Sequence, residues 1–141
     1  MKHFMLSIII AAILTSCSPG KDLEGSPVGL VNLEGYSQIK NKDEQFHVIT
    51  SDKELRALFM DDSNDRKKPD FEGQLAIAIS VEHQSFHFTK ATIAGRDMNV
   101  YYEVGYGSPV NVATVPKNQS IRRVNFYQDN YLVRTIDVDT R

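Results

Sequence analysis

The stretch QLAIAISV, residues 74–81, decides the fold because it alternates large and small apolar side chains. Its odd-numbered positions carry Leu, Ile, Ile and Val, and its even-numbered positions carry Gln, Ala, Ala and Ser. Successive side chains of a strand point to opposite faces, so the large residues share one face and the small residues share the other. Neither face carries a charge, and the small face lets another element approach closely. The pattern predicts a central strand buried on both sides.

The segments on either side of this stretch also favour strands. SFHFTKATI (85–93) and DMNVYYEV (97–104) alternate with period two, and QFHVIT (45–50) also reads as a strand. Near the end of the chain, SIRRVNFYQ and NYLVRTIDV flank the turn-prone pair Asp129-Asn130, which predicts a terminal hairpin.

One helix is expected between the strands at 45–50 and 74–81. Ser51 and Glu54 have the spacing of a capping box, in which each side chain satisfies a free backbone N–H group. Leu55, Leu58 and Phe59 follow on one side, so we expect a short amphipathic helix from residue 52 to about 60. The predicted class is therefore α+β: a mostly antiparallel sheet with one short helix near its start.

The N-terminal residues read as an export signal. Lys2 and His3 precede an almost wholly apolar run, Phe4 to Leu14, which is about half the ~20 residues that a membrane-spanning helix needs. Leu14-Thr15-Ser16-Cys17 resembles a bacterial lipobox, and the resemblance implies that the chain is cut before Cys17 and that this thiol carries lipid. The readings that compete are a secreted protein with a chance cysteine and a retained membrane helix. Cys17 is the only cysteine, so it has no disulfide partner within the chain.

Three segments follow from this interpretation. Residues 1–16 are a signal peptide, and residues 17–28 are the lipidated cysteine and a flexible tether rich in Pro, Gly and Ser. Residues 29–141 form a single strand-rich globular domain, which is long enough for one core. In lipoproteins of this type a non-Asp residue after the cysteine, here Ser18, implies the outer membrane.

The charge balance argues against nucleic acid as a partner. The formal net charge is −2, and it becomes −3 when Lys2 leaves with the signal peptide. An acidic exported domain is unsuited to a polyanion.

Motifs that could carry chemistry are weak. Asp61, Ser63, Asp65 and Glu72 have EF-hand spacing, but Arg66 occupies the position that needs glycine, so a charged solvated loop is favoured. His83 and His87 would lie about 13 Å apart on a straight strand, which is too far for them to share a metal ion. Even if His47 lies nearby, we therefore interpret them as surface histidines in preference to a metal site. No nucleophile elbow or phosphate-binding glycine loop occurs. We predict no cofactor; catalysis is undecided, although an enzyme has no support here.

Tyrosine and arginine, which carry much of the energy of protein interfaces, gather in the last third of the chain. They could form a partner surface, or they could be ordinary strand composition. The residues of this predicted surface are Tyr101, Tyr106, Arg122, Arg123, Tyr127, Tyr131 and Arg134.

The motifs HVITSDKELRAL, PDF and LAIAISV occur in that order over residues 46–81. They resemble the C-terminal domain of PrcB-like bacterial lipoproteins, which implies a non-catalytic module associated with a surface protease complex. The Thr-Gly-Gly-Tyr-like turn of that family is replaced here by VEHQSFHF. The leading hypothesis is a lipid-anchored envelope protein that binds another envelope protein. The alternative is an envelope domain that binds a small ligand or a metal.

Overall fold

The computed structural model describes residues 25–60 and 66–139. Within them the chain forms nine strands and one helix in the order β1 (Ser26–Val28), β2 (Val31–Leu33), β3 (Phe46–Ile49), α1 (Asp52–Leu58), β4 (Gln74–Ser80), β5 (Phe86–Ala94), β6 (Asp97–Val104), β7 (Val110–Pro116), β8 (Arg123–Gln128) and β9 (Tyr131–Asp137).

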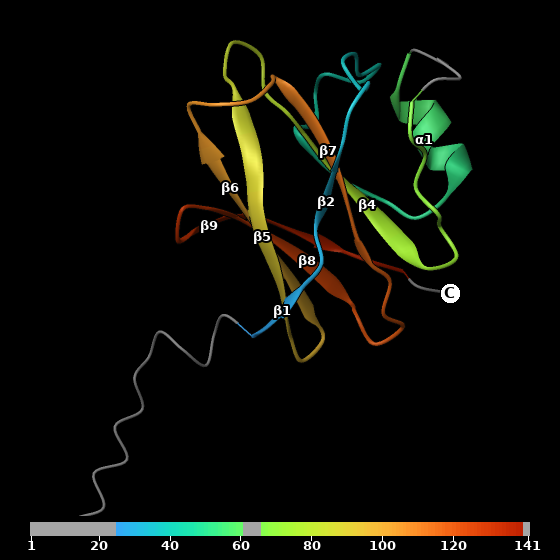
Figure 1. Cartoon of the computed structure of the whole chain (residues 1–141), viewed down its shortest axis with the longest axis vertical. Coiled ribbons are helices and arrows are strands. Elements are labelled where there is room, and N and C mark those ends of the chain that lie inside the picture. The colour runs from blue at the N-terminus through green and yellow to red at the C-terminus, as the bar shows by residue number, and fades with distance from the viewer. Residues whose placement is uncertain (1–24, 61–65, 140–141) are drawn as a thin grey trace, which may run out of the picture.

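The strands form two sheets that pack face to face (Figure 1). One sheet has five strands in the order β1-β5-β6-β8-β9, and the other has four in the order β2-β7-β4-β3. Strands β6 and β8 run parallel, and every other neighbouring pair runs antiparallel. Each sheet has one strongly apolar face, and stacking the two sheets removes both of those faces from water.

Strand β4 lies between β7 and β3, so the central strand expected at 74–81 is confirmed. Its large side chains, Leu75, Ile77 and Ile79, are fully buried in the core between the sheets. They share that core with Val100 of β6 and Phe126 of β8. Full burial of such a side chain stabilises a fold by about 1.5–3 kcal/mol.

The small face of β4 supports a second apolar cluster outside the four-stranded sheet. Ala76 and Ala78 are fully buried there, and they belong to the same cluster as Leu55 of α1 and Phe59 just after it. Phe59 also meets Tyr36 edge-on, with ring centroids 4.9 Å apart. The alanines leave room for these larger groups to approach the sheet.

The predicted α+β class is wrong: the fold is mostly β, built from two sheets. Helix α1 has seven residues, and it covers part of one outer sheet face without forming a layer of its own. It also joins β3 and β4, which pair antiparallel as direct neighbours. The helix is therefore a connection between two neighbouring strands of one sheet. The strand-helix-strand order does not indicate an α+β fold here.

The strands predicted at 45–50, 85–93 and 97–104 and the terminal hairpin are confirmed as β3, β5, β6 and β8–β9. Three strands were missed, namely β1, β2 and β7. The expected start of the domain at Gly29 is too late, because Ser26–Val28 already pairs with β5 and Val28 packs against the main core. The sheet thus takes in residues that the sequence assigned to the tether.

The helix begins as its capping motif predicts, with one difference. The Ser51 hydroxyl accepts a hydrogen bond from the Glu54 N–H group at 3.2 Å. The Glu54 carboxylate in turn accepts from the N–H group of Thr50 at 2.7 Å, one residue before the expected donor. An ion pair between Arg56 and Asp52 at 2.8 Å adds support along the exposed side.

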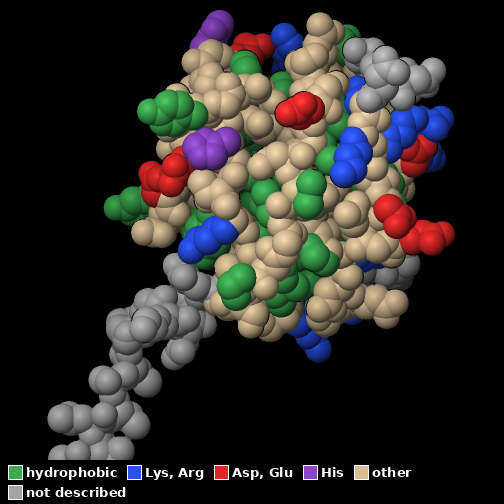
Figure 2. All heavy atoms as spheres, viewed as in Figure 1, with side chains coloured by type: hydrophobic (Ala, Val, Ile, Leu, Met, Phe, Trp, Pro, Cys, Tyr) green, Lys and Arg blue, Asp and Glu red, His purple; other side chains and the backbone are tan. Residues whose placement is uncertain are grey.

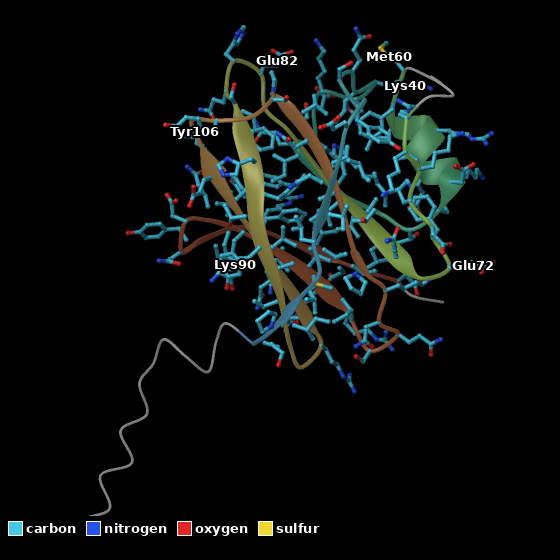
Figure 3. All side chains as sticks on the ribbon, in the orientation of Figure 1. Lys40, Met60, Glu72, Glu82, Lys90 and Tyr106 are labelled. Atoms are coloured by element: carbon cyan, nitrogen blue, oxygen red, sulfur yellow. The ribbon has the colours of Figure 1, made fainter. Side chains whose placement is uncertain are left out.

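Several sequence predictions fall outside the described residues. Cys17 and the signal peptide precede them, and Asp61, Ser63 and Asp65 lie in the gap. Glu72 lies in the turn before β4, where its N–H group donates to Asp70 and its side chain lies at the periphery of the molecule (Figure 3). Within residues 25–60 and 66–139, no helix is long and apolar enough to cross a bilayer.

We predict that Ala78→Leu lowers the free energy of unfolding by about 1–3 kcal/mol, because the larger side chain overpacks the contact between β4 and α1. Urea denaturation measures the change. Lys53→Leu, at an exposed position of the same helix, is the control and should stay within about 0.5 kcal/mol of the wild type. Equal stability of Ala78→Leu and the wild type would contradict the close packing of this face.

Candidate functional site

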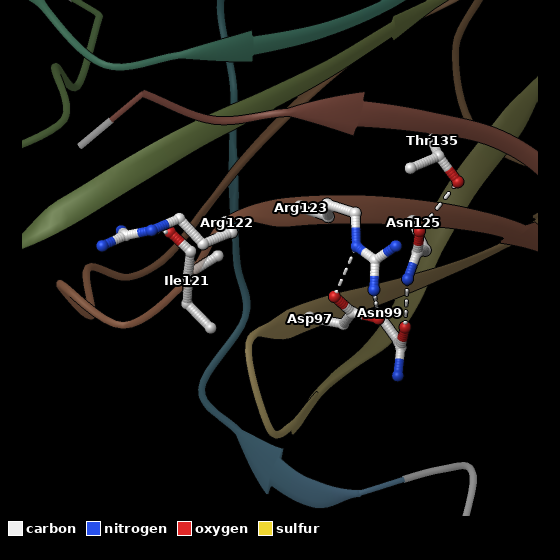
Figure 4. Close-up of polar contacts among 7 residues, drawn as sticks. All are labelled: Asp97, Asn99, Ile121, Arg122, Arg123, Asn125 and Thr135. Atoms are coloured by element: carbon white, nitrogen blue, oxygen red, sulfur yellow. Dashed lines mark hydrogen bonds and ion pairs between the residues drawn. The ribbon is translucent and has the colours of Figure 1, made fainter.

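The outward face of the five-stranded sheet carries a row of polar side chains. The register aligns Thr92, Asn99, Asn125 and Thr135 across β5, β6, β8 and β9. The Asn125 amide donates to the Asn99 side-chain oxygen at 3.0 Å, and the Thr135 hydroxyl donates to the Asn125 side-chain oxygen at 2.8 Å (Figure 4). Asn99 and Asn125 are only 3% and 8% exposed, so these bonds are needed to satisfy their amides.

An aromatic row lies on one side of these polar residues. Tyr101 and Tyr127 stack with ring centroids 5.0 Å apart and ring planes 17° apart. The Lys90 ammonium lies 4.6 Å from the centre of the Tyr101 ring. Burial raises the pKa of Tyr127, and the neighbouring Tyr101 adds to that rise. The rings of Tyr101 and Tyr127 are therefore packed against each other.

An ion pair lies on the other side of the polar row. The Arg123 guanidinium donates two hydrogen bonds to the Asp97 carboxylate, at 2.9 and 3.0 Å. This hydrogen bonding raises the pKa of Arg123. The ion pair joins the starts of the parallel strands β6 and β8. The arginine is therefore already bonded to a residue of its own protein.

The structure brings together three of the seven residues of the predicted tyrosine and arginine surface. Tyr101, Arg123 and Tyr127 lie on the outward sheet face described above. The Arg122 guanidinium donates to the backbone oxygens of Gln119 and Ile121. Tyr106 lies in the loop between β6 and β7 (Figure 3), and Tyr131 and Arg134 lie on β9, which pairs with β8.

The strongest exposed apolar feature is the beginning of β9. Tyr131, Leu132 and Val133 are consecutive, and they are 79%, 56% and 46% exposed. Strand β9 forms an edge of the five-stranded sheet, so this apolar run lies beside an open row of backbone groups. We call these three residues the apolar edge. Sequence reasoning included Tyr131 and missed the other two, although three apolar residues in a row break the period-two alternation of a half-buried strand.

A groove of about 320 Å³ runs beside the apolar edge, between β9 and the segment that leads into β3. Its apolar part is made by Phe46 and Val133, and Phe46 is held in place by Phe126, whose ring centroid is 5.1 Å away. Its polar rim includes carboxylates on one side and a guanidinium on the other. The lining residues are Asp43, Glu44, Gln45, Phe46, Val133 and Arg134.

The histidines occupy separate places. The His47 ring lies 2.9 Å from the backbone oxygen of Glu44, on β3 of the four-stranded sheet. His83 lies in the turn between β4 and β5 with a φ of 63°. His87 is on β5 of the other sheet, with its Nε2 atom 3.7 Å from the Glu103 carboxylate. In the part of the chain that the structure describes, no three His, Cys, Asp or Glu side chains are grouped to hold a metal ion.

A second cleft, of about 490 Å³, lies at the end of the molecule where Lys40, Met60 and Glu82 come together (Figure 3). Lys42 forms an ion pair with Glu82 at 3.0 Å, and the hydrogen bond from Lys42 lowers the pKa of that carboxyl. The Lys40 ammonium donates to the backbone oxygen of Arg56 at 3.0 Å. Both lysines of the cleft are thus engaged with the protein itself.

No protein-family model, curated protein or solved structure matches this chain.

We predict that a substitution in the polar row lowers stability and that one in the apolar edge leaves it nearly unchanged. Asn125→Ala should lower the free energy of unfolding by about 1–3 kcal/mol, because Asn99 and Thr135 lose their shared partner. Leu132→Ser should change it by no more than about 0.5 kcal/mol, because Leu132 is mostly exposed. Urea denaturation of both variants provides the comparison. A loss above 1 kcal/mol for Leu132→Ser would mean that the apolar edge serves the fold.

Proposed function

We propose that this chain is a lipid-anchored protein of the bacterial cell envelope whose two-sheet domain binds a partner protein without catalysing a reaction. The observation that carries the proposal is the apolar edge: three adjacent apolar residues that the core does not use. Exposed apolar clusters of this kind on a soluble domain mark interaction sites. The groove next to it offers the partner both an apolar floor and charged rims.

The anchor part of the proposal is supported by Leu14-Thr15-Ser16-Cys17. Lipid on Cys17 would hold the chain at a membrane, and Ser18 favours the outer membrane of a two-membrane envelope. The described chain joins the five-stranded sheet at β1, and β9 is the opposite edge of that sheet. An anchor that leads into β1 therefore leaves the apolar edge on the far side of the sheet from its point of attachment.

The charge distribution supports a protein partner over nucleic acid. On the face shown in Figure 2, basic and acidic side chains are interspersed, and no cluster of one sign covers it. Phosphate backbones are bound by concentrated positive charge, which this face does not provide. The ordered motifs at residues 46–81 make an envelope protease complex one candidate for the partner.

A second candidate function is the binding of a small ligand, and the cleft around Lys40, Lys42 and Met60 favours it. Its volume of about 490 Å³ lies in the range of small-molecule sites. A ligand there would have to compete with the ion pair between Lys42 and Glu82. For this reason partner binding at β9 is preferred.

The lipid anchor predicts that cells fed radioactive palmitate label the wild-type protein and fail to label Cys17→Ala. Ser18→Ala is the control, because it changes the neighbouring residue and keeps the thiol. Gel autoradiography of the isolated protein gives the readout. Label retained by Cys17→Ala would show that the lipid is attached elsewhere or that no thioether is formed at this position.

Partner binding predicts that a photo-crosslinking amino acid at position 132 captures a specific envelope protein in intact cells. The same group at Val31 is the matched control, because Val31 is 47% exposed on the edge strand β2 of the other sheet. Mass spectrometry identifies the products. If both positions yield the same products, or neither yields any, the apolar edge is not a binding site.

A further inference from the structure

We propose that the open edge of β9 accepts an extended segment of the partner as a sixth strand of its sheet, and that apolar and basic side chains alternate in this segment. The inference rests on the proposed partner binding and specifies how it occurs. In strand addition, backbone hydrogen bonds supply affinity, and pockets for alternate side chains supply specificity. Strand β9 and the groove beside it offer both.

The backbone of β9 has donors and acceptors that face away from β8. Just beyond the end of β9, the Val138 N–H group donates to the oxygen of Arg122, the residue before β8, at 2.8 Å. Backbone direction alternates along a strand, so the N–H and C=O groups of Asp137 and Thr135 point to the open edge. The side chains agree: Thr135 and Asn125 are opposite each other and their side-chain oxygens are 2.8 Å apart, as expected for a closely spaced, non-hydrogen-bonded pair.

The start of β9 is irregular, which limits the open ladder to its second half. Phe126 pairs with Arg134 and Tyr127 pairs with Leu132, so Val133 is an extra residue in β9, a bulge. The bulge turns the side chains of Val133 and Arg134 toward the same groove. An added strand would therefore bond at Thr135 and Asp137 and place its neighbouring side chains over Phe46 and Val133.

The charges around this edge favour a basic segment. Asp43 and Glu44 line the groove, and Arg134 is the cation that lines it with them. Asp137 lies further along the strand opposite Arg123, whose guanidinium is already bonded to Asp97, so carboxylates outnumber cations here. Among the residues that the structure describes, neither Asp43 nor Arg134 forms an ion pair. A second copy of β9 would bring one arginine and one aspartate, which does not offset the negative charge. The complementary occupant is another protein with basic side chains.

The test uses the full-length protein in detergent and a fluorescent eight-residue peptide of alternating lysine and valine. Fluorescence anisotropy should show it binding at least about tenfold more tightly than an alternating glutamate and valine peptide. Thr135→Pro should weaken binding at least about tenfold, because it removes a donor at the open edge, where proline is tolerated. Thr135→Ala is the matched control: it also loses the hydroxyl bond to Asn125, but it keeps the N–H group and should bind normally.

A second measurement does not depend on the folding of a variant. Hydrogen exchange of the Thr135 and Asp137 amides should slow at least about tenfold when the peptide binds to the wild-type protein. A peptide with its alternate backbone nitrogens methylated should give no such protection. Equal binding by Thr135→Pro and Thr135→Ala, or unchanged exchange, would overturn strand addition.

The outcomes separate this inference from the proposed function. Specific crosslinking at position 132 together with equal binding by the two Thr135 variants would leave partner binding intact and refute strand addition. Failure of both experiments would refute both. A third outcome is that sedimentation detects a dimer that Thr135→Pro abolishes and Thr135→Ala retains. That result would show that the added strand comes from a second copy of this chain, and it would overturn the proposal that another protein supplies it.

Discussion

The burial of both faces of β4 is the constraint on which this structure depends. Its large side chains fill the space between the two sheets, and its alanines accept the helix and the loop aromatics on the other side. A strand in this position cannot lie at an edge, so β3 and β7 must flank it. Because the large face needs a second apolar sheet against it, the five remaining strands assemble there. The helix is a consequence of the small face, since only small side chains leave it room.

The row of polar side chains on the outward face of the five-stranded sheet then fixes how β6, β8 and β9 pair. Parallel pairing of β6 with β8 is slightly weaker than antiparallel pairing, and the buried bond between Asn99 and Asn125 specifies its register. A slip of one residue would place Asn99 opposite a core residue and leave two amides buried without partners. The bond from Thr135 extends the same register to β9. Interactions that look suited to a partner, among them the Tyr101–Tyr127 stack and the Asp97–Arg123 pair, instead hold the sheet together.

Sequence patterns located most of the local structure and missed its arrangement. The period-two runs at β4, β5 and β6, the turn at Asp129 and the cap at Ser51 are local signals, and each corresponds to an observed element. The division into two sheets depends on which strands pair, and β7 pairs with a strand more than thirty residues earlier in the chain. The short strands β1 and β2 have only three residues, too few to show a period. The composition that suggested one tyrosine and arginine surface could not reveal which side chains stack or pair with each other.

The apolar edge has no explanation within the fold itself. Edge strands invite pairing with other chains, and proteins usually shield them with charge, proline or bulges. Strand β9 has a bulge at Val133, which covers only the start of the strand. Arg134 and Asp137 add charge, yet Tyr131 and Leu132 remain exposed beside them. Replacing those two residues with polar ones would remove an aggregation hazard and would expose no core group. The fold thus gains nothing from their exposure, and the partner contact proposed above is the role that would account for it.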